Sequence, residues 1–341
     1  MRLKIEQECP QCSAPIELDE TDRVLHCPYC EVRHVLFAPD HFRFVLPQKA
    51  DGREIFYAPY LRFKGNVYFC TEDQIGHRAV DVTRLGISVK GLPETLGVRP
   101  QAMRMRFLGP AESGSLLRFG LRASDIVVRA ARLASGSVRA RITHRAFIGE
   151  TVSLIYLPLY VDGERIFDGV LSRAVTKIPG EEGFPRGLMR KDPNWSLKLT
   201  ASLCPHCGWN LEGEKDSVVL LCRNCVSAWE VFKGRFRQVD LMTLPDRFGE
   251  ASYLPFWRIS ARVRGIEIRS FADFVRVTNQ PVVPKSDWEN QDMRFWIPAF
   301  KVRPKIFLDL ARRLTCSPDE EAKPADSFPR DNVFPVTLPG A

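Results

Sequence analysis

Short runs in which apolar and polar residues alternate recur along this chain, and they predict β-strands. MRMRFL at 103–108 alternates arginine with apolar residues, and VRARITHRAFI at 138–148 does so through its first half. YLPLYVDGERIFDGV at 156–170 has the pattern of a strand, a DGE turn and a returning strand. Helical patterns are scarce, and we expect short helices only near 124–134 and 305–314. The expected fold class is therefore α+β with mostly β content.

A proline flanked by aromatic residues marks four of these expected strands. The four segments are YAPYLR from Tyr57, YLPLYV from Tyr156, YLPFWR from Tyr253 and WIPAFK from Trp296. A proline inside a strand usually marks a sheet edge or a bulge. We expect the aromatic side chains to form a core beneath a sheet, the alternative being a cage for a ligand or a platform that stacks bases.

Eight of the ten cysteines fall in four CxxC pairs, and the pairs form two quartets. In each quartet fourteen residues separate the two pairs. A CxxC turn places two thiolates on one side of a tight knuckle, and two knuckles joined by a hairpin complete the tetrahedron that Zn²⁺ accepts. We expect the intervening residues to form strand, turn and returning strand, with the turns at Asp19–Asp22 and Gly213–Asp216. The predicted ligands are Cys9, Cys12, Cys27 and Cys30 in the first ribbon and Cys204, Cys207, Cys222 and Cys225 in the second.

The expected cofactors are two structural Zn²⁺ ions, with iron as the rival, since four thiolates bind either metal. Four thiolates leave no open position for water or substrate, so the zinc is not expected to be catalytic. His26 and His206 lie beside or inside a CxxC pair, and we expect them to be exposed knuckle residues rather than ligands. Cys70 and Cys316 stand alone and are expected to be small buried apolar side chains.

The similarity between the two halves extends beyond the cysteines. Tyr57 follows Cys9 by 48 residues and Tyr253 follows Cys204 by 49 residues, and a Val-Arg-Pro element recurs at 98–100 and 302–304. This order predicts an internal duplication in which each ribbon leads into an antiparallel sheet module. The expected domains are zinc ribbon 1 at 1–42, a β-rich module at 43–195, zinc ribbon 2 at 196–236, a second β-rich module at 237–315 and a flexible tail at 316–341. The last residues of the tail, 332–341, are apolar enough to dock as a strand, either on this molecule or on a partner.

Ribbons followed by Tyr-x-Pro-aromatic strands resemble a group of uncharacterised bacterial double zinc-ribbon proteins, with four-cysteine ribbons like those of transcription factor B. The resemblance rests on the two CxxC pairs of each ribbon and on the aromatic-proline strands. Ribbons of this type are also compared with those of replication-restart helicases, but the chain has no GxxxxGK[ST] loop to hold a phosphate. The resemblance therefore implies the ribbon and not a helicase activity.

The positive charge of the chain is concentrated in one segment, 99–145. It holds ten arginines and no lysine, opposed only by Glu112 and Asp125, so its formal charge equals the net +8 of the whole chain. Arginine binds phosphate or carboxylate through a planar fork, so this face could bind nucleic acid or an acidic partner. The alternative is a solvated sheet face paired with acidic residues elsewhere in the fold. The candidate contacts are Arg104, Arg106, Arg139, Arg141 and Arg145.

Other patterns restrict the function. The sequence has no HExxH, GxSxG, GxGxxG or Walker motif, and its six histidines are scattered. The longest apolar run, 152–161, is far shorter than the ~20 residues that span a bilayer. No export signal is visible, and we expect a cytoplasmic protein.

The sequence therefore predicts a non-enzymatic zinc-binding scaffold or adaptor with an unidentified protein partner and no small-molecule substrate. A nucleic-acid-binding protein that uses the face 99–145 is the alternative. A rubredoxin-like iron electron carrier is the weaker alternative.

Overall fold

The computed structural model describes most of the chain, and the chain divides into two compact units. The described residues are 3–49, 52–109, 112, 114–120, 141–178, 195–244, 252–262, 265–317, 323–324, 329 and 332–340. Unit 1 comprises Met1–Ser202 and Phe232–Arg235, and unit 2 comprises Leu203–Val231 and Phe236–Ala341. The helix expected at 124–134 lies outside the described residues.

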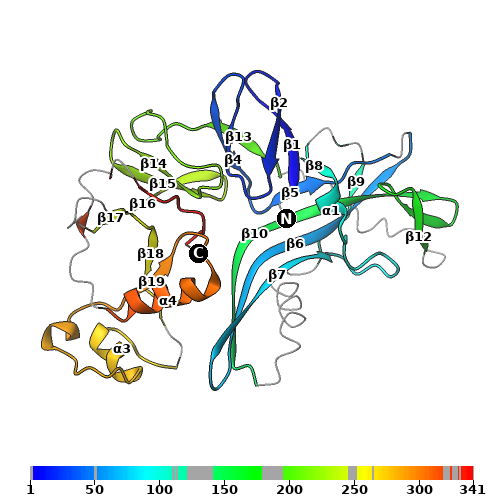
Figure 1. Ribbon diagram of the computed structural model, residues 1–341. Coiled ribbons are helices and arrows are strands. Elements are labelled where there is room, and N and C mark those ends of the chain that lie inside the picture. The colour runs from blue at the N-terminus through cyan, green and yellow to red at the C-terminus, as the bar shows by residue number, and fades with distance from the viewer. Residues whose placement is uncertain are drawn as a thin grey trace. The chain divides into compact units, whose positions relative to one another are not determined.

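A large sheet organises unit 1. Along its main path the strand order is β12-β11-β10-β5-β8-β1-β2, and β6 pairs with β10, β7 and β9 (Figure 1). Most neighbours are antiparallel, whereas β1–β8, β5–β10 and β6–β9 are parallel. The strands of this sheet are β1 (Lys4–Glu8), β2 (Pro15–Asp19), β5 (Phe42–Val45), β6 (Ile55–Cys70), β7 (Ile75–Leu85), β8 (Arg104–Phe107), β9 (Ser115–Leu116), β10 (His144–Asp162), β11 (Arg165–Asp168) and β12 (Arg173–Lys177).

The two aromatic-proline segments of unit 1 are neighbours in this sheet. β6 and β10 are antiparallel, and their register places Tyr57 opposite Pro158 and Pro59 opposite Tyr156. Figure 1 shows β6, β7 and β10 running side by side as long strands. The DGE turn expected between β10 and β11 is confirmed, with Gly163 at a φ of 60°.

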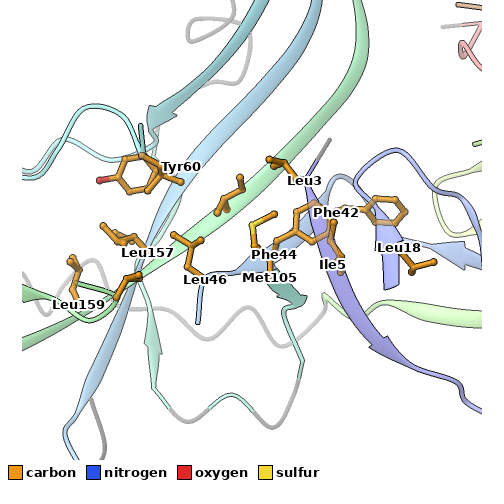
Figure 2. Close-up of a cluster of buried hydrophobic side chains, with 14 of the residues drawn as sticks. Leu3, Ile5, Leu18, Phe42, Phe44, Leu46, Tyr60, Met105, Leu157 and Leu159 are labelled. Atoms are coloured by element: carbon orange, nitrogen blue, oxygen red, sulfur yellow. The ribbon is translucent and has the colours of Figure 1, made fainter. Parts of the chain in front are cut away.

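The core of unit 1 joins the first ribbon to the large sheet. Its buried side chains come from strands far apart in the sequence, including Ile5, Phe44, Met105 and Leu157 (Figure 2). Tyr60 is fully buried in the same cluster, and its hydroxyl donates to the carbonyl of Pro93. The expectation of an aromatic and aliphatic core beneath the aromatic-proline strands is therefore confirmed for unit 1.

The first ribbon has the expected strands, but their pairing differs from the expected hairpin. β2 pairs with β1 in the large sheet, whereas β3 (Val24–His26) pairs with β4 (Arg33–Phe37). β4 also pairs with β13 (Lys198–Ala201), a segment that the sequence-based boundaries assign to the second ribbon. Within the polar turn at Asp19–Asp22, the Asp19 N–H donates to the Asp22 carboxylate at 2.9 Å. The first ribbon is therefore built into the sheet of unit 1.

Unit 2 contains the second ribbon and a smaller set of elements. In the ribbon, Glu212 and Leu221 exchange two backbone hydrogen bonds across the expected turn, which confirms that hairpin. The elements are β14 (Val219–Cys222), β15 (Ser227–Phe232), β16 (Arg235–Val239), β17 (Met242–Thr243), β18 (Phe256–Ile259), α3 (Phe271–Val277), the 3-10 helix η2 (Ser286–Glu289), β19 (Phe295–Pro298), α4 (Pro304–Thr315) and β20 (Lys323–Pro324). The turn between β15 and β16, Phe232–Arg235, is grouped with unit 1.

The aromatic-proline segments of unit 2 also pair with each other. β18 and β19 are antiparallel, with Phe256 opposite Pro298. The order and direction match those of β6 and β10, but the pairing is much shorter and its register differs. Both Val-Arg-Pro elements begin helices, α1 (Arg99–Ala102) and α4, with proline in the first turn where its missing N–H costs nothing. The helix expected at 305–314 is confirmed, whereas a duplication of the whole unit remains a prediction.

The C-terminal residues 332–340 pack onto unit 2. The backbone N–H of Val218, in the second ribbon, donates to Val336, and the indole of Trp257, in β18, donates to the carbonyl of Leu338. Thr337 and Leu338 are buried, and both donate their N–H groups to Ala299. This end of the chain therefore docks on its own molecule and ties the second ribbon to the β18–β19 pair.

Candidate metal centres

The four CxxC knuckles share one backbone geometry. In each, the residue directly after the second cysteine has a positive φ: 57° at Ser13, 60° at Glu31, 73° at Gly208 and 48° at Val226. In the first three, that residue donates its N–H to the carbonyl of the first cysteine, at 2.8–2.9 Å. This left-handed turn brings both thiols of a pair to the same side of the backbone. Only one of the four positions is glycine, so backbone strain is accepted at the other three.

The sulfur atoms of each quartet are arranged as a metal site requires. Within a quartet all four lie within 4.8 Å of one another. The distances are 3.7 Å for Cys9–Cys30 and 3.6 Å for Cys12–Cys27 in the first ribbon. In the second ribbon they are 3.6 Å for Cys204–Cys225 and 3.5 Å for Cys207–Cys222.

These distances fit a metal tetrahedron and not a disulfide. Tetrahedral Zn–S bonds of ~2.3 Å correspond to sulfur–sulfur edges of about 3.8 Å, whereas a disulfide is about 2.05 Å long. All ten cysteines are free thiols. The two quartets also have the same burial pattern, since the first and third cysteines are buried, the second is exposed and the fourth is half-buried. Both quartets could therefore hold a metal ion, and the predicted ligand sets come together as the spacing requires.

The knuckle backbone favours the thiolate form of two buried cysteines. Desolvation opposes ionisation of Cys27, but the N–H groups of Cys30 and Tyr29 outweigh it and lower the pKa of Cys27 to about 7. Desolvation likewise opposes ionisation of Cys204, and the N–H groups of its own knuckle help to lower its pKa to about 6. Each quartet therefore has one buried cysteine whose thiolate form is favoured, whereas desolvation and the neighbouring thiols raise the pKa of Cys222 and of Cys30 to about 12.

Side chains next to the second quartet add hydrogen bonds to sulfur, and the sequence analysis missed them. The Ser227 hydroxyl lies 3.0 Å from Cys225 Sγ and 3.8 Å from Cys204 Sγ. The indole N–H of Trp229 donates to the same hydroxyl oxygen at 2.8 Å. The side chain of Asn224 is the largest cause of the lowered pKa of the Cys207 thiol. A serine two residues after the last ligand was the available sequence signal.

The two knuckle histidines stay outside the sulfur clusters. His26 and His206 are exposed, and neither belongs to a group of residues whose ligand atoms converge. The expectation that they are surface residues is confirmed. His34, in β4, is buried instead, and desolvation lowers its pKa.

The structure pairs part of the arginine-rich face with acidic residues. Arg104 forms ion pairs with Glu6 and Glu17, at 3.3 and 3.4 Å. Arg106 pairs with Glu112 at 3.3 Å. All of these pairs lie in unit 1, and the two arginine side chains are more than half exposed.

The other candidate arginines differ in their exposure. Arg141 is exposed, Arg145 is half-buried in β10, and Arg139 lies outside the described residues. Arg99, from the same segment, pairs with the buried Asp168 at 3.0 Å. Some of the positive charge of the segment 99–145 is therefore matched within the fold.

Comparisons with known proteins do not extend this description. No family model, curated protein or solved structure matches the chain. Among the described residues, no helix has both the length and the apolar character needed to cross a membrane. The two tetracysteine sites are thus the features from which function must be argued.

Proposed function

We propose that this protein is a non-enzymatic scaffold or adaptor that binds two structural Zn²⁺ ions and mediates protein–protein interaction. The observation that carries the proposal is the pair of complete cysteine tetrahedra. With four thiolates as ligands, each ion has no open position at which water or a substrate could bind. A metal held in this way stabilises its surroundings, and Cys9 and Cys27 belong to the main core of unit 1.

Exposed aromatic side chains beside both metal sites support a role in binding proteins. Tyr29, inside the second knuckle of ribbon 1, is 68% exposed, and Trp209, next to the first knuckle of ribbon 2, is 59% exposed. Tyrosine and tryptophan are enriched at protein interfaces, where they contribute much of the binding energy. The metal holds the backbone that carries them, so each ribbon presents a rigid aromatic contact.

The arginine-rich face supports the nucleic-acid alternative less well. The ion pairs of Arg104 and Arg106 would have to be given up or shared before these side chains could neutralise phosphates. Membership of the bacterial double zinc-ribbon group is also part of the proposal and rests on the cysteine and aromatic-proline motifs. Cytoplasmic location is proposed because eight cysteines in metal-type pairs suit a reducing compartment.

Metal analysis tests the first half of the proposal. Elemental analysis of the purified protein should give two zinc ions per chain, and removing them with a chelator should unfold both ribbons. Structural zinc sites contribute ~10 kcal/mol or more of binding energy in small zinc domains, so circular dichroism should show loss of β-structure that added zinc restores. Bound iron with a visible absorption band, or a fold unchanged by the chelator, would contradict structural zinc.

An affinity experiment tests the second half. The zinc-loaded full chain and the Y29A/W209A variant are used as baits, with V283A as a control because Val283 is 85% exposed and lies in neither ribbon. A protein captured by the wild type and by V283A, but not by Y29A/W209A at equal zinc content, is the expected result. A salt-sensitive complex with nucleic acid that R104A/R106A removes, with no protein captured, would favour the alternative.

A further inference from the structure

The two cysteine quartets differ in the side chains that surround their sulfur atoms. In the second ribbon, the Ser227 hydroxyl oxygen accepts the indole N–H of Trp229, so its own hydrogen is free to be donated. A metal-bound thiolate has no hydrogen, so it can only accept. The contact of 3.0 Å from Ser227 to Cys225 is therefore a hydroxyl-to-sulfur hydrogen bond in the metal-bound state.

The equivalent position of the first ribbon carries no such donor. Ser227 lies two residues after the fourth cysteine, and the same position in ribbon 1 is Val32, an apolar side chain. The backbone places the two residues alike, since Cys222 is paired with Ser227 in β14–β15 and the Cys27 N–H donates to Val32 at 3.1 Å.

The sulfur geometry and the burial order do not separate the two sites. Both quartets have the same order of buried, exposed, buried and half-buried cysteines, and the sulfur atoms of each lie within 4.8 Å of one another. The exposed Cys12 and Cys207 leave a cysteine of each site open to a competing ligand. The hydrogen bonds to sulfur are therefore a difference between the sites that bears directly on metal retention.

Hydrogen bonds to a coordinating thiolate draw charge from the sulfur and fix its orientation. A thiolate of lower charge is less easily protonated or attacked, and a fixed one dissociates less readily from the metal.

From this difference we infer that the two zinc ribbons are functionally unequal: ribbon 1 is the exchangeable metal site, and ribbon 2 is a retained site protected by the hydrogen bond from Ser227 to its thiolates. The inference rests on the proposed zinc binding. Ribbon 1 is also the ribbon whose cysteines belong to the core of the large sheet, with Cys9 and Cys27 in one cluster with Ile5 and Phe44. Loss of its metal would therefore loosen unit 1 and make that unit responsive to zinc supply.

The test follows the release of zinc from the full chain loaded with two zinc ions. An excess of a colorimetric zinc chelator is added, the released metal is measured with time, and thiols are alkylated with N-ethylmaleimide and identified by mass spectrometry. We expect two phases of equal amplitude. Cys12 and Cys30 should be labelled during the first phase, and Cys207 and Cys225 only during the second.

Two variants locate the cause. S227A should accelerate the second phase by about tenfold, the lower end of the effect of removing an outer-shell partner of a metal site. S217A is the matched control, because Ser217 is also buried in ribbon 2 but accepts the N–H of Glu214 instead of contacting sulfur. Its second phase should keep the wild-type rate.

The outcomes separate this inference from the proposed function. Two zinc ions lost at one rate, or ribbon 2 labelled first, overturn the inference and leave the zinc-ribbon proposal intact. Equal acceleration by S227A and S217A also overturns it, because general destabilisation of the ribbon would then be the cause. A protein that neither contains nor takes up zinc overturns the proposed function and the inference together.

Discussion

A buried ion pair links the turn of the first ribbon to the long strand β6, and replacing Glu20 by alanine tests its importance. Glu20 and Arg62 are 1% and 2% exposed. The guanidinium of Arg62 donates twice to the Glu20 carboxylate, each time at 3.0 Å, and also contacts Asp81. Burial opposes the charge of Arg62, but the two carboxylates outweigh it and raise the pKa of Arg62.

The expected loss follows from what E20A leaves behind. Removing one partner of a buried pair costs about 3–5 kcal/mol, because the remaining charge stays buried. Asp81 still partners Arg62 after the change, which places the expected loss of unfolding free energy near the lower end, about 3 kcal/mol. The D81A variant should cost only about 1 kcal/mol, because the Asp81 side chain is 37% exposed and water can replace it.

Hydrogen exchange of β6 peptides in the zinc-loaded protein is the assay, since it reports on unit 1 alone. The double variant E20L/R62M should recover most of the stability lost in E20A, because an apolar pair of similar volume can replace a buried ion pair. Equal effects of E20A and D81A, both below about 1 kcal/mol, would refute the argument, because the pair would then behave as a surface salt bridge.

Three further predictions follow from the backbone. G65A should weaken the β6–β10 pairing and lower the melting temperature, because a Cβ at Gly65 would lie 2.3 Å from the carbonyl oxygen of Ile148; unchanged melting would contradict this contact. V226G should stabilise the metal-loaded second ribbon by about 1 kcal/mol, because glycine adopts a φ of 48° without strain. Chelator titration measures this change, and a variant that loses its metal more easily than the wild type would contradict the prediction. Deleting 332–341 should expose Trp257 and shift tryptophan fluorescence to longer wavelength, and an unchanged spectrum would show that the segment does not pack there.

Features with a local physical cause were predictable from the sequence. The two cysteine quartets could be identified because a CxxC knuckle is set by a few consecutive residues, and the equal spacing of the pairs then predicts two similar clusters. Alternation predicted β8 and the β10–β11 hairpin, and the Pro-initiated helix α4 was expected within one residue of each observed end. In each case neighbouring residues carry the whole signal.

Features that depend on distant residues were decided only by the tertiary structure. The strands around the turn at Asp19–Asp22 look like a hairpin, but β2 finds its partner in β1 and β3 finds its partner in β4. The arginines at 104 and 106 look available in the sequence, yet Glu6, Glu17 and Glu112 are brought beside them by folding. Spacing alone thus shows that this chain carries two similar cysteine tetrahedra. Which strands hold them, and which sulfur atoms receive a hydrogen bond, depends on contacts that exist only once the chain has folded.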